Sequence, residues 1–323
     1  MSKFKKIRRK MMWPVEAVPL YIILFLIKLF TLKGARRIGG FLGWIIYCIP
    51  EQRKLALKNM DIAFPDKSDE EKKKIVKKSL KGIAKVFIEF MWFYKRPHLV
   101  EKYVKIPEEV KKSYFAHKDP EKSVIVIAMH WGNWELSPRG FKLIDDLEGS
   151  VIARKLKNPM LEKMMINGRE GKGLSVIHEK GAARNIVKAI KNRLSIGMLV
   201  DQNTKTHQGG VFGKFFGLPV TISKTPASLA RKMNTMLMVV NCKRTDDGFE
   251  MCLKHLPKKV DEYESDQELS EDILKLMEEF VRDAPEQWVW MYKRWNYIPI
   301  NWESQKEKYP DYAIMDKKLE YPV

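Results

Sequence analysis

A histidine and a glutamate stand five positions apart in the segment HWGNWE at 130–135, directly after the apolar run SVIVIAM at 123–129. If that run is a strand of an α/β sheet, His130 lies just beyond its carboxyl end, where open α/β sheets bind their ligands. Residues five apart on an ideal helix point about 140° away from each other, so the two side chains would not meet within one helix. We therefore expect His130 in a strand-to-helix turn that Gly132 eases, with Glu135 in the first helical turn and reaching back to the ring.

This pair has the chemistry of a general base. A carboxylate bound to one imidazole nitrogen fixes the tautomer and raises the basicity of the other nitrogen. Such a ring is suited to take a proton from a hydroxyl. The substrate can bring that hydroxyl, so no serine or cysteine nucleophile is needed. The same spacing is common by chance, and it is the position of His130 after an apolar strand that favours a catalytic role.

Other common chemistries find no support in the sequence. The glycines at 168, 171 and 173 are in the wrong order for a dinucleotide site, and Gly213-Lys214 lacks the rest of a phosphate-binding loop. Neither HExxH nor GxSxG occurs, and the three cysteines contain no CxxC pair. The other histidines lack partners at metal-ligand spacing; they are His98, His117, His178, His207 and His255. We expect neither a metal nor a cofactor.

The elements that would position the pair can be predicted from apolar periodicity. One long helix is predicted over Asp69–Tyr94, starting from Ser68 with Glu71 as its capping-box partner. After it, predicted strands at 123–129, 150–153, 174–177 and 195–200 alternate with predicted helices at 158–168 and 181–192. A hairpin around 246–248 joins strands at 237–244 and 249–256, and an amphipathic helix spans 269–280. This order predicts an α/β fold with a mostly parallel central sheet flanked by helices.

The N-terminus carries a basic run at 3–10 and then 22 mostly apolar residues from Met11 to Leu32. As a helix this segment would be ~33 Å long, just enough for a hydrocarbon core of about 30 Å. No small-residue cleavage site follows it, so a cleaved signal peptide is disfavoured. Positive charge on both flanks leaves open a spanning helix, an in-plane anchor, or a hairpin that returns through Ile38–Ile49. The alternative is that both stretches are buried helices of the body.

We therefore divide the chain into a basic tail with a membrane-anchoring helix or hairpin at 1–50 and a single α/β domain at 51–323, whose residues after Asn301 form a surface tail. The net charge of +20 favours a polyanionic partner, which could be anionic lipid, an acidic protein or nucleic acid. The rival to an enzyme is a non-catalytic basic protein that binds membranes or nucleic acid. Nucleic acid is disfavoured as a partner because the sequence has no RNA-binding motif, zinc finger or repeat.

Four blocks in order resemble the bacterial lipid A late acyltransferases, the lauroyl and myristoyl transferases with an H-x4-D/E motif. The blocks are MHWGNWE at 129–135; RKLKNP at 154–159 with Arg169 and Gly171; LVDQ at 199–202 with GV at 210–211 and FFGLP at 215–219; and APEQWVW at 284–290 with RW at 294–295. With the N-terminal anchor, the resemblance covers residues 10 to 300. Two departures are Trp131, where the family often has phenylalanine, and Asn296, which replaces a frequent basic residue.

The resemblance implies a fold like that of glycerolipid acyltransferases. It also implies transfer of a fatty acyl chain from a thioester, usually on acyl carrier protein, to a hydroxyl of a lipid A precursor. His130 would take the proton of that hydroxyl, with Glu135 supporting the imidazolium. The protein would lie at the bacterial inner membrane with its catalytic domain facing the cytoplasm. A related transferase for another glycolipid or for a phospholipid would share this chemistry, so the acceptor stays open.

The resemblance also suggests residues that contact the substrate. We expect substrate or oxyanion contacts from Arg154, Arg169 and the turn that contains Asn133, because the oxyanion of acyl transfer needs hydrogen-bond donors. Either arginine could instead hold a phosphate of the acceptor. We expect Asp201, at the end of a predicted strand, to orient Arg169 or the acceptor, or to cap a turn.

Overall fold

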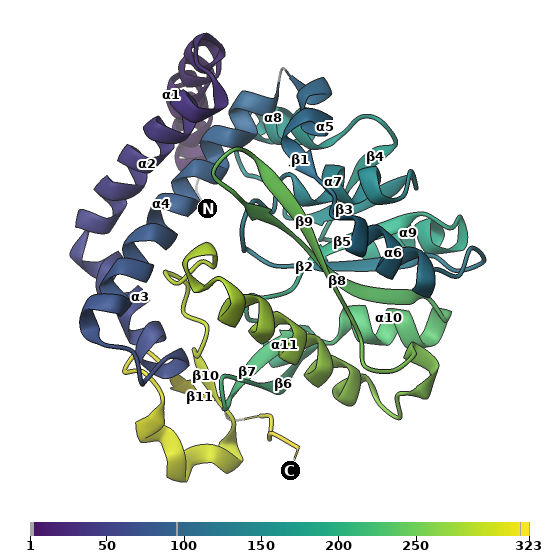
Figure 1. Cartoon of the computed structure of the whole chain (residues 1–323). Coiled ribbons are helices and arrows are strands. Elements are labelled where there is room, and N and C mark those ends of the chain that lie inside the picture. The colour runs from purple at the N-terminus through teal and green to yellow at the C-terminus, as the bar shows by residue number, and fades with distance from the viewer. Residues whose placement is uncertain (1–2, 95, 317, 323) are drawn as a thin grey trace.

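A seven-stranded sheet forms the centre of the molecule in a computed structural model, which describes the backbone of residues 3–94, 96–316 and 318–322 and their side chains from Met12 onward (Figure 1). In order across the sheet, the strands are β1 (Val104–Lys105), β9 (Phe249–His255), β8 (Met236–Arg244), β2 (Val124–Ala128), β5 (Ser195–Leu199), β3 (Gly149–Ala153) and β4 (Leu174–His178). The five strands from β8 to β4 are parallel, whereas β9 is antiparallel to β8 and pairs with β1. The predicted α/β fold with a mostly parallel sheet is confirmed.

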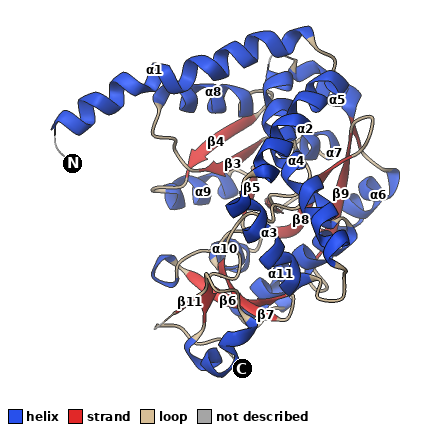
Figure 2. Ribbon diagram, turned by 90° about the vertical axis from the view of Figure 1, so that its left-hand side faces the viewer, coloured by secondary structure: helices blue, strands red, loops and turns tan. Residues whose placement is uncertain are grey.

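Strand β2 lies in the middle of the sheet, and all five of its side chains are buried. Because successive side chains point to opposite faces, Ile125 and Ile127 join one hydrophobic core while Val124 and Val126 join the other. Helices cover the sheet on both faces, as a largely parallel sheet requires (Figure 2). The helices of the body are α3 (Pro50–Ala63), α4 (Asp69–Tyr94), α5 (Val100–Tyr103), α6 (Glu108–His117), α7 (Ser137–Ile144), α8 (Pro159–Arg169), α9 (Ala182–Lys191), α10 (Thr225–Met233) and α11 (Asp266–Asp283).

Most predicted elements appear within a few residues of their expected bounds. Helix α4 has the predicted limits, and the capping box forms: Ser68 N–H donates to the Glu71 carboxylate at 2.9 Å, and Glu71 N–H donates to Ser68 Oγ at 3.3 Å. The hairpin of β8 and β9 is confirmed as well. The antiparallel pair β6 (Gly210–Phe215) and β7 (Leu218–Ser223), which forms a separate small sheet, had not been predicted.

The residues after Asn301 pack against the body instead of forming the surface tail that we expected. A 3-10 helix over Ile300–Lys308 leads to β11 (Ile314–Met315), which pairs with β10 (Tyr297–Ile298). Tyr309 is buried and donates its hydroxyl proton to the carbonyl of Pro219 at 3.0 Å. Tyr312 donates to the side chain of Asn59 in α3. Two tyrosines therefore hold this segment in place.

The first apolar stretch forms helix α1 (Lys3–Leu26), which extends away from the sheet (Figure 2). Among the described residues, Met12–Leu29 is the one segment long and apolar enough to cross a membrane, with a mean hydropathy of 1.7. Only 17% of this segment is buried, so the alternative of a core helix is wrong for this stretch. Its exposed apolar surface is consistent with membrane anchoring. The basic run at 3–10 lies in α1, but its side chains are outside the described ones.

The second apolar stretch lies in helix α2 (Leu32–Cys48), which packs along α4. The two backbones approach closely at two glycines. A Cβ added at Gly39 would lie 2.8 Å from the Cα of Lys85, and one added at Gly43 would lie 2.3 Å from the Cα of Lys81. This stretch is thus packed onto the body and is not a second spanning arm. The domain boundary after residue 50, which falls at the start of α3, stays a prediction.

The close approach of α2 to α4 predicts opposite effects for two neighbouring substitutions. Gly43→Ala should lower the free energy of unfolding by about 1–3 kcal/mol, since the new methyl group meets backbone that cannot move aside. Gly40→Ala is the matched control, because the nearest atom to its Cβ is the flexible Lys85 Cε at 3.5 Å. It should stabilise the protein by up to about 1 kcal/mol through helix propensity. Urea unfolding measures both, and stabilisation by both substitutions would contradict the packing.

Candidate active site

The carboxyl ends of two neighbouring parallel strands, β2 and β5, bring His130 and Asp201 together. Nδ1 of His130 lies 2.8 Å from Oδ1 of Asp201, and the backbone N–H of His130 donates to Oδ2 at 3.0 Å. The indole N–H of Trp288 donates to the same Oδ2 at 3.0 Å. An ionised carboxylate only accepts hydrogen bonds, so Nδ1 carries the proton and Nε2 is left as the acceptor. The aspartate is buried, whereas the histidine side chain is 22% exposed.

Glu135 does not reach the imidazole ring, contrary to our expectation. Helix α7 begins only at Ser137, and Glu135 lies in the turn before it. Its carboxylate instead pairs with the guanidinium of Arg169, the last residue of α8, through Nε at 2.9 Å and Nη2 at 2.7 Å. This is the two-pronged geometry in which arginine binds a carboxylate best, and it leaves Nη1 out of the pair. Glu135, and not Asp201, therefore orients Arg169, so that one of the roles expected of Asp201 is wrong, and its contact with the acceptor stays a prediction.

The two pairs set the charge states of the site. Burial of the His130 ring opposes its protonation, but the charge and hydrogen bond of Asp201, helped by the charge of Glu135, outweigh burial and raise the pKa of His130. Burial also disfavours the Asp201 carboxylate, yet His130 and Trp288 together lower the pKa of Asp201. At neutral pH the aspartate is therefore ionised and holds a ring that readily accepts a proton.

The turn after His130 can form only with glycine at 132. Gly132 has a φ of +63°, and a Cβ there would lie 2.1 Å from the carbonyl oxygen of Cys242. The backbone N–H of Gly132 donates to the carbonyl of Gln287 at 3.0 Å. The glycine thus brings the turn into contact with β8 as well as bending the chain.

Asn133 is enclosed in the fold and presents no surface to a substrate. Its side chain is fully buried, donates to Glu89 at 2.8 Å and accepts the N–H of Leu136 at 3.1 Å. Its backbone N–H donates to the carbonyl of Cys242 at 2.7 Å. The predicted substrate or oxyanion role of Asn133 is therefore wrong, because the residue is used to fix the turn. The backbone N–H groups of residues 132 and 133, which we expected to donate to the oxyanion, are hydrogen-bonded to carbonyl groups within the protein.

The two arginines that were predicted together are placed differently. Arg169 is joined to the motif through Glu135, and its side chain is 24% exposed. Arg154 is an exposed residue of the loop that follows β3, a strand that lies beside β5. Arg154 thus follows a strand end at the same edge of the sheet as His130, whereas Arg169 is joined to the histidine turn through its pair with Glu135.

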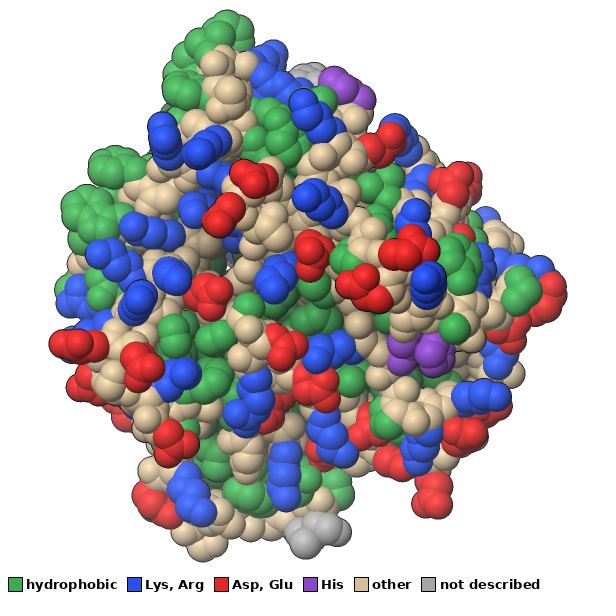
Figure 3. Space-filling model, in the orientation of Figure 1, with side chains coloured by type: hydrophobic (Ala, Val, Ile, Leu, Met, Phe, Trp, Pro, Cys, Tyr) green, Lys and Arg blue, Asp and Glu red, His purple; other side chains and the backbone are tan. Residues whose placement is uncertain are grey.

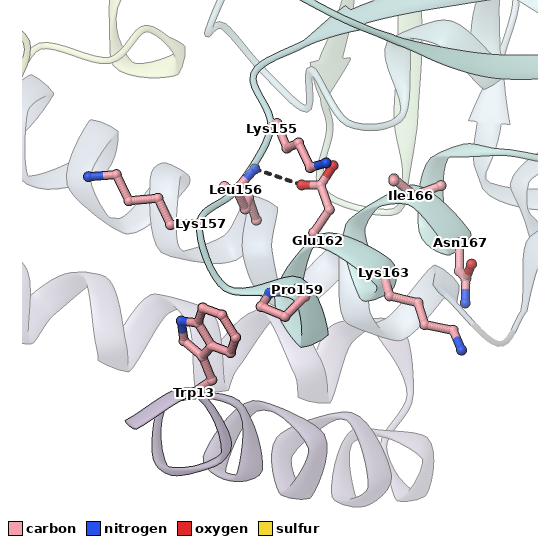
Figure 4. A pocket seen from close by; sticks show the side chains of 9 residues that line it. All are labelled: Trp13, Lys155, Leu156, Lys157, Pro159, Glu162, Lys163, Ile166 and Asn167. Carbon is pink, nitrogen blue, oxygen red and sulfur yellow. Dashed lines mark hydrogen bonds between the residues drawn. The ribbon is translucent and has the colours of Figure 1, made fainter. Parts of the chain in front are cut away.

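A cavity of about 360 Å³ lies beside this edge, between α1 and α8 (Figure 4). Trp13 of α1 faces Pro159 of α8 across it, and Glu162 of α8 accepts the N–H of Leu156 at 2.7 Å. Lysines at 155, 157 and 163 also line the cavity. It does not include His130, but α8 connects it to the site by ending in Arg169. Among the described residues, no cluster of three histidine, cysteine or acidic side chains could hold a metal ion.

Sequence reasoning missed the contact between His130 and Asp201 and the part played by Trp288. Both His130 and Asp201 follow predicted strands, so each could be placed at a strand end. Which two strands are neighbours was not readable from the chain, because β2 and β5 are separated by two other strands in sequence. The spacing in sequence favours Glu135 as the partner of His130, whereas strand order brings Asp201 to the ring.

Comparison with known proteins shows that this α/β protein is an acyltransferase. A model of the bacterial lipid A biosynthesis acyltransferase family matches residues 3–297, and the chain belongs to this family. It is 24% identical to the lipid A biosynthesis lauroyltransferase of Escherichia coli over 81% of this chain and 85% of the relative. It is 22% identical to the lipid A biosynthesis palmitoleoyltransferase of Escherichia coli over 79% and 82% of the two chains. A Haemophilus influenzae lipid A biosynthesis acyltransferase is 24% identical over 59% of this chain and 60% of the relative.

The Asp201 contact predicts a measurable change in the titration of His130. In the wild-type protein, the pKa of His130 should lie above the ordinary value of about 6.5. Asp201→Asn should lower this pKa, because the substitution removes the charge that favours the imidazolium. NMR titration of the histidine rings, with the His130 signal assigned by its absence in His130→Gln, measures the shift.

The same shift gives the sign of the pH dependence of stability. A raised folded-state pKa means that protonated His130 contributes stability at low pH, which is lost as pH rises from about 6.5 through the folded-state pKa. The free energy of unfolding of the wild type should therefore fall across that window, and the fall should be smaller in Asp201→Asn. The exposed His207→Gln is the control and should behave as the wild type. An unchanged His130 titration in Asp201→Asn would contradict the contact.

Proposed function

We propose that the protein transfers a fatty acyl chain from an acyl carrier protein thioester to a hydroxyl of a lipid A precursor, with His130 as the general base. One observation carries this proposal: Nδ1 of His130 is bound to Asp201, so in the neutral ring the proton is on Nδ1 and Nε2 is the nitrogen that can accept a proton. A ring held in this way is prepared to accept one proton from a hydroxyl that the substrate brings. Membership of the lipid A acyltransferase family supports the acceptor class.

The reaction then needs no covalent enzyme intermediate. Nε2 of His130 takes the hydroxyl proton as the acceptor oxygen attacks the thioester carbonyl, and the new C–O bond gives a tetrahedral oxyanion. The C–S bond breaks, the carbonyl re-forms, and the proton on His130 passes to the leaving thiolate. Asp201 stabilises the transient imidazolium, because its carboxylate is fixed by three hydrogen bonds before the reaction starts.

Glu135 acts through Arg169 in this proposal and supports the imidazolium only through its charge. The carboxylate fixes the guanidinium by two bonds and leaves Nη1 to meet either the oxyanion or a phosphate of the acceptor. Arg154, which is exposed at the neighbouring strand end, is better placed to hold a head-group phosphate. We favour the oxyanion role for Arg169, because it is the arginine that is tied to the histidine turn.

The location follows from α1 and from charge. The exposed apolar segment Met12–Leu29 supports anchoring in the bacterial inner membrane, with the catalytic domain on the cytoplasmic side where acyl carrier protein is found. The net charge of +20 favours an acidic donor protein and a phosphorylated acceptor, since both would be steered to a positive surface.

Loss of the base should stop the chemistry and spare the fold. We expect His130→Ala to lower kcat by about 10²–10⁴-fold. Asp201→Asn should also lower kcat strongly because the tautomer is no longer fixed, and Glu135→Ala should lower it less. Transfer of a labelled acyl chain from acyl carrier protein to a lipid A precursor gives kcat, and circular dichroism checks folding. The exposed His207→Ala is the control, and near-normal transfer by a folded His130→Ala protein would overturn the mechanism.

The two arginines should be separable by the phosphate on the acceptor. If Arg169 meets the oxyanion, Arg169→Ala should lower kcat for phosphorylated and dephosphorylated acceptors alike, because the tetrahedral centre forms in both cases. If Arg154 holds a phosphate, Arg154→Ala should raise KM for the phosphorylated acceptor and barely change it for the dephosphorylated one. Steady-state kinetics of both variants on both acceptors tests this. Wild-type kinetics in all four combinations would remove both arginines from the site.

A further inference from the structure

Helix α2 has two apolar faces of different kinds. The face toward α4 is made of residues that are buried, among them Ala35, Gly39 and Gly43, and the glycines let the two backbones come close. The opposite face carries large apolar side chains that the body does not cover: Phe41 is 60% exposed, Leu42 36%, Trp44 43% and Ile45 43%, and Ile49, directly after the helix, is 42% exposed. One face of α2 therefore carries small residues that pack against α4, and the opposite face carries large apolar residues that remain exposed.

The exposed side chains form one continuous stripe. At 100° per residue, positions 41, 42, 44 and 45 fall within one half of the α2 circumference and the two packed glycines in the other half, and Ile49 follows the last turn of the helix. The rings of Phe41 and Trp44 lie one turn apart and stack, with their centroids 5.9 Å from each other. Figure 3 shows apolar side chains along the outer edge of the molecule where Figure 1 places α2. We call these five residues the outer stripe of α2.

The charged residues of α2 are all of one sign. Arg37 and Lys33 are exposed and lie about one turn and two turns before Phe41, respectively, on the same side of the helix. Between Thr31 and Pro50 the chain has no acidic residue. An apolar stripe with tryptophan and flanking basic residues is the pattern of a helix that lies in the plane of a membrane surface.

The geometry excludes a spanning role for α2. Its 17 residues reach only about 26 Å as a helix, which is short of a hydrocarbon core of about 30 Å. One whole side of it is also occupied by α4. The helix follows α1 after a short connection, so its outer stripe begins close to where the apolar segment Met12–Leu29 ends.

We propose that the outer stripe of α2 lies flat in the boundary between head groups and acyl chains of an anionic bilayer, as a second attachment beside α1. This inference rests on the membrane location proposed above. It implies that α2 fixes the orientation of the body on the membrane, since an attachment through α1 alone would leave the body free to rotate about it. The occupant is lipid, and a second copy of this chain is the competing outcome of the test.

The test uses the full-length protein with spin labels. In a Cys48→Ser, Cys252→Ser background, a label is placed by Phe41→Cys or Ile45→Cys on the outer stripe, and by Lys188→Cys on α9 as an exposed control. Collision with oxygen, which concentrates in lipid, is compared with collision with a water-soluble nickel complex. The protein is measured in detergent and on vesicles of phosphatidylethanolamine and phosphatidylglycerol.

On vesicles, the ratio of oxygen to nickel accessibility should rise several-fold at 41 and 45 and stay constant at 188. An outer-stripe label that stays as accessible to nickel as Lys188→Cys would overturn the proposal. The proposal would also be overturned if the label became inaccessible to both reagents and a short distance were measured between labels on two molecules. That result would identify a second copy as the occupant.

A functional arm separates this proposal from the acyltransferase mechanism. Phe41→Glu with Trp44→Glu should raise KM several-fold for acceptor embedded in vesicles and leave kinetics on detergent-dispersed acceptor unchanged. Phe115→Glu on α6 is the matched control, since Phe115 is 51% exposed but lies elsewhere on the body. Equal loss in vesicles and in detergent would mean structural damage and count against the proposal. If the wild type transfers no acyl chain at all, the proposed function fails while the accessibility measurements still decide the outer stripe.

Discussion

A completely buried carboxylate, that of Glu89 in α4, ties the N-terminal helices to the turn that carries His130. It accepts from Arg36 Nε at 2.7 Å, from Arg244 Nη2 at 2.8 Å and from Asn133 Nδ2 at 2.8 Å. Burial alone would raise the pKa of Glu89, but the two arginines hold it below its ordinary value. Removing one partner of a buried ion pair typically costs about 3–5 kcal/mol, so the three side chains around Glu89 are strongly constrained to stay together.

This cluster reaches in two directions. Arg36 of α2 also donates to the carbonyls of three residues in the turn between β8 and β9, which are Thr245, Asp246 and Gly248. Arg244 at the end of β8 donates to the carbonyl of Gly132 at 3.3 Å. Helix α2, the antiparallel edge of the sheet and the histidine turn are therefore parts of one rigid unit. Within this unit the backbone N–H groups of Gly132 and Asn133 are hydrogen-bonded to carbonyl groups of the protein. The groups available for chemistry are therefore side chains.

The site is accordingly built from two carboxylates with one cationic or basic partner each. Asp201 is buried and holds His130, while Glu135 is less deeply buried and holds Arg169. Because each carboxylate is already bound, neither competes for the group that the other orients, and both partners keep one nitrogen for the substrate. Helix α1 comes close to this edge of the sheet, because its Trp13 lines the cavity together with residues of the loop after β3.

The sequence by itself determined the elements and the motif. Apolar periodicity predicted α4 within its observed limits, the alternation of strands and helices predicted the parallel sheet, and the place of His130 after an apolar strand marked the strand end that carries it. These features depend on neighbours in the chain, so they are readable from it.

The tertiary structure decided the partners. Strand order placed Asp201, and not Glu135, against the His130 ring. Glu89 of α4 accepts a hydrogen bond from the side-chain amide of Asn133. Contacts between residues far apart in the chain depend on which elements become neighbours, and local patterns do not contain that information.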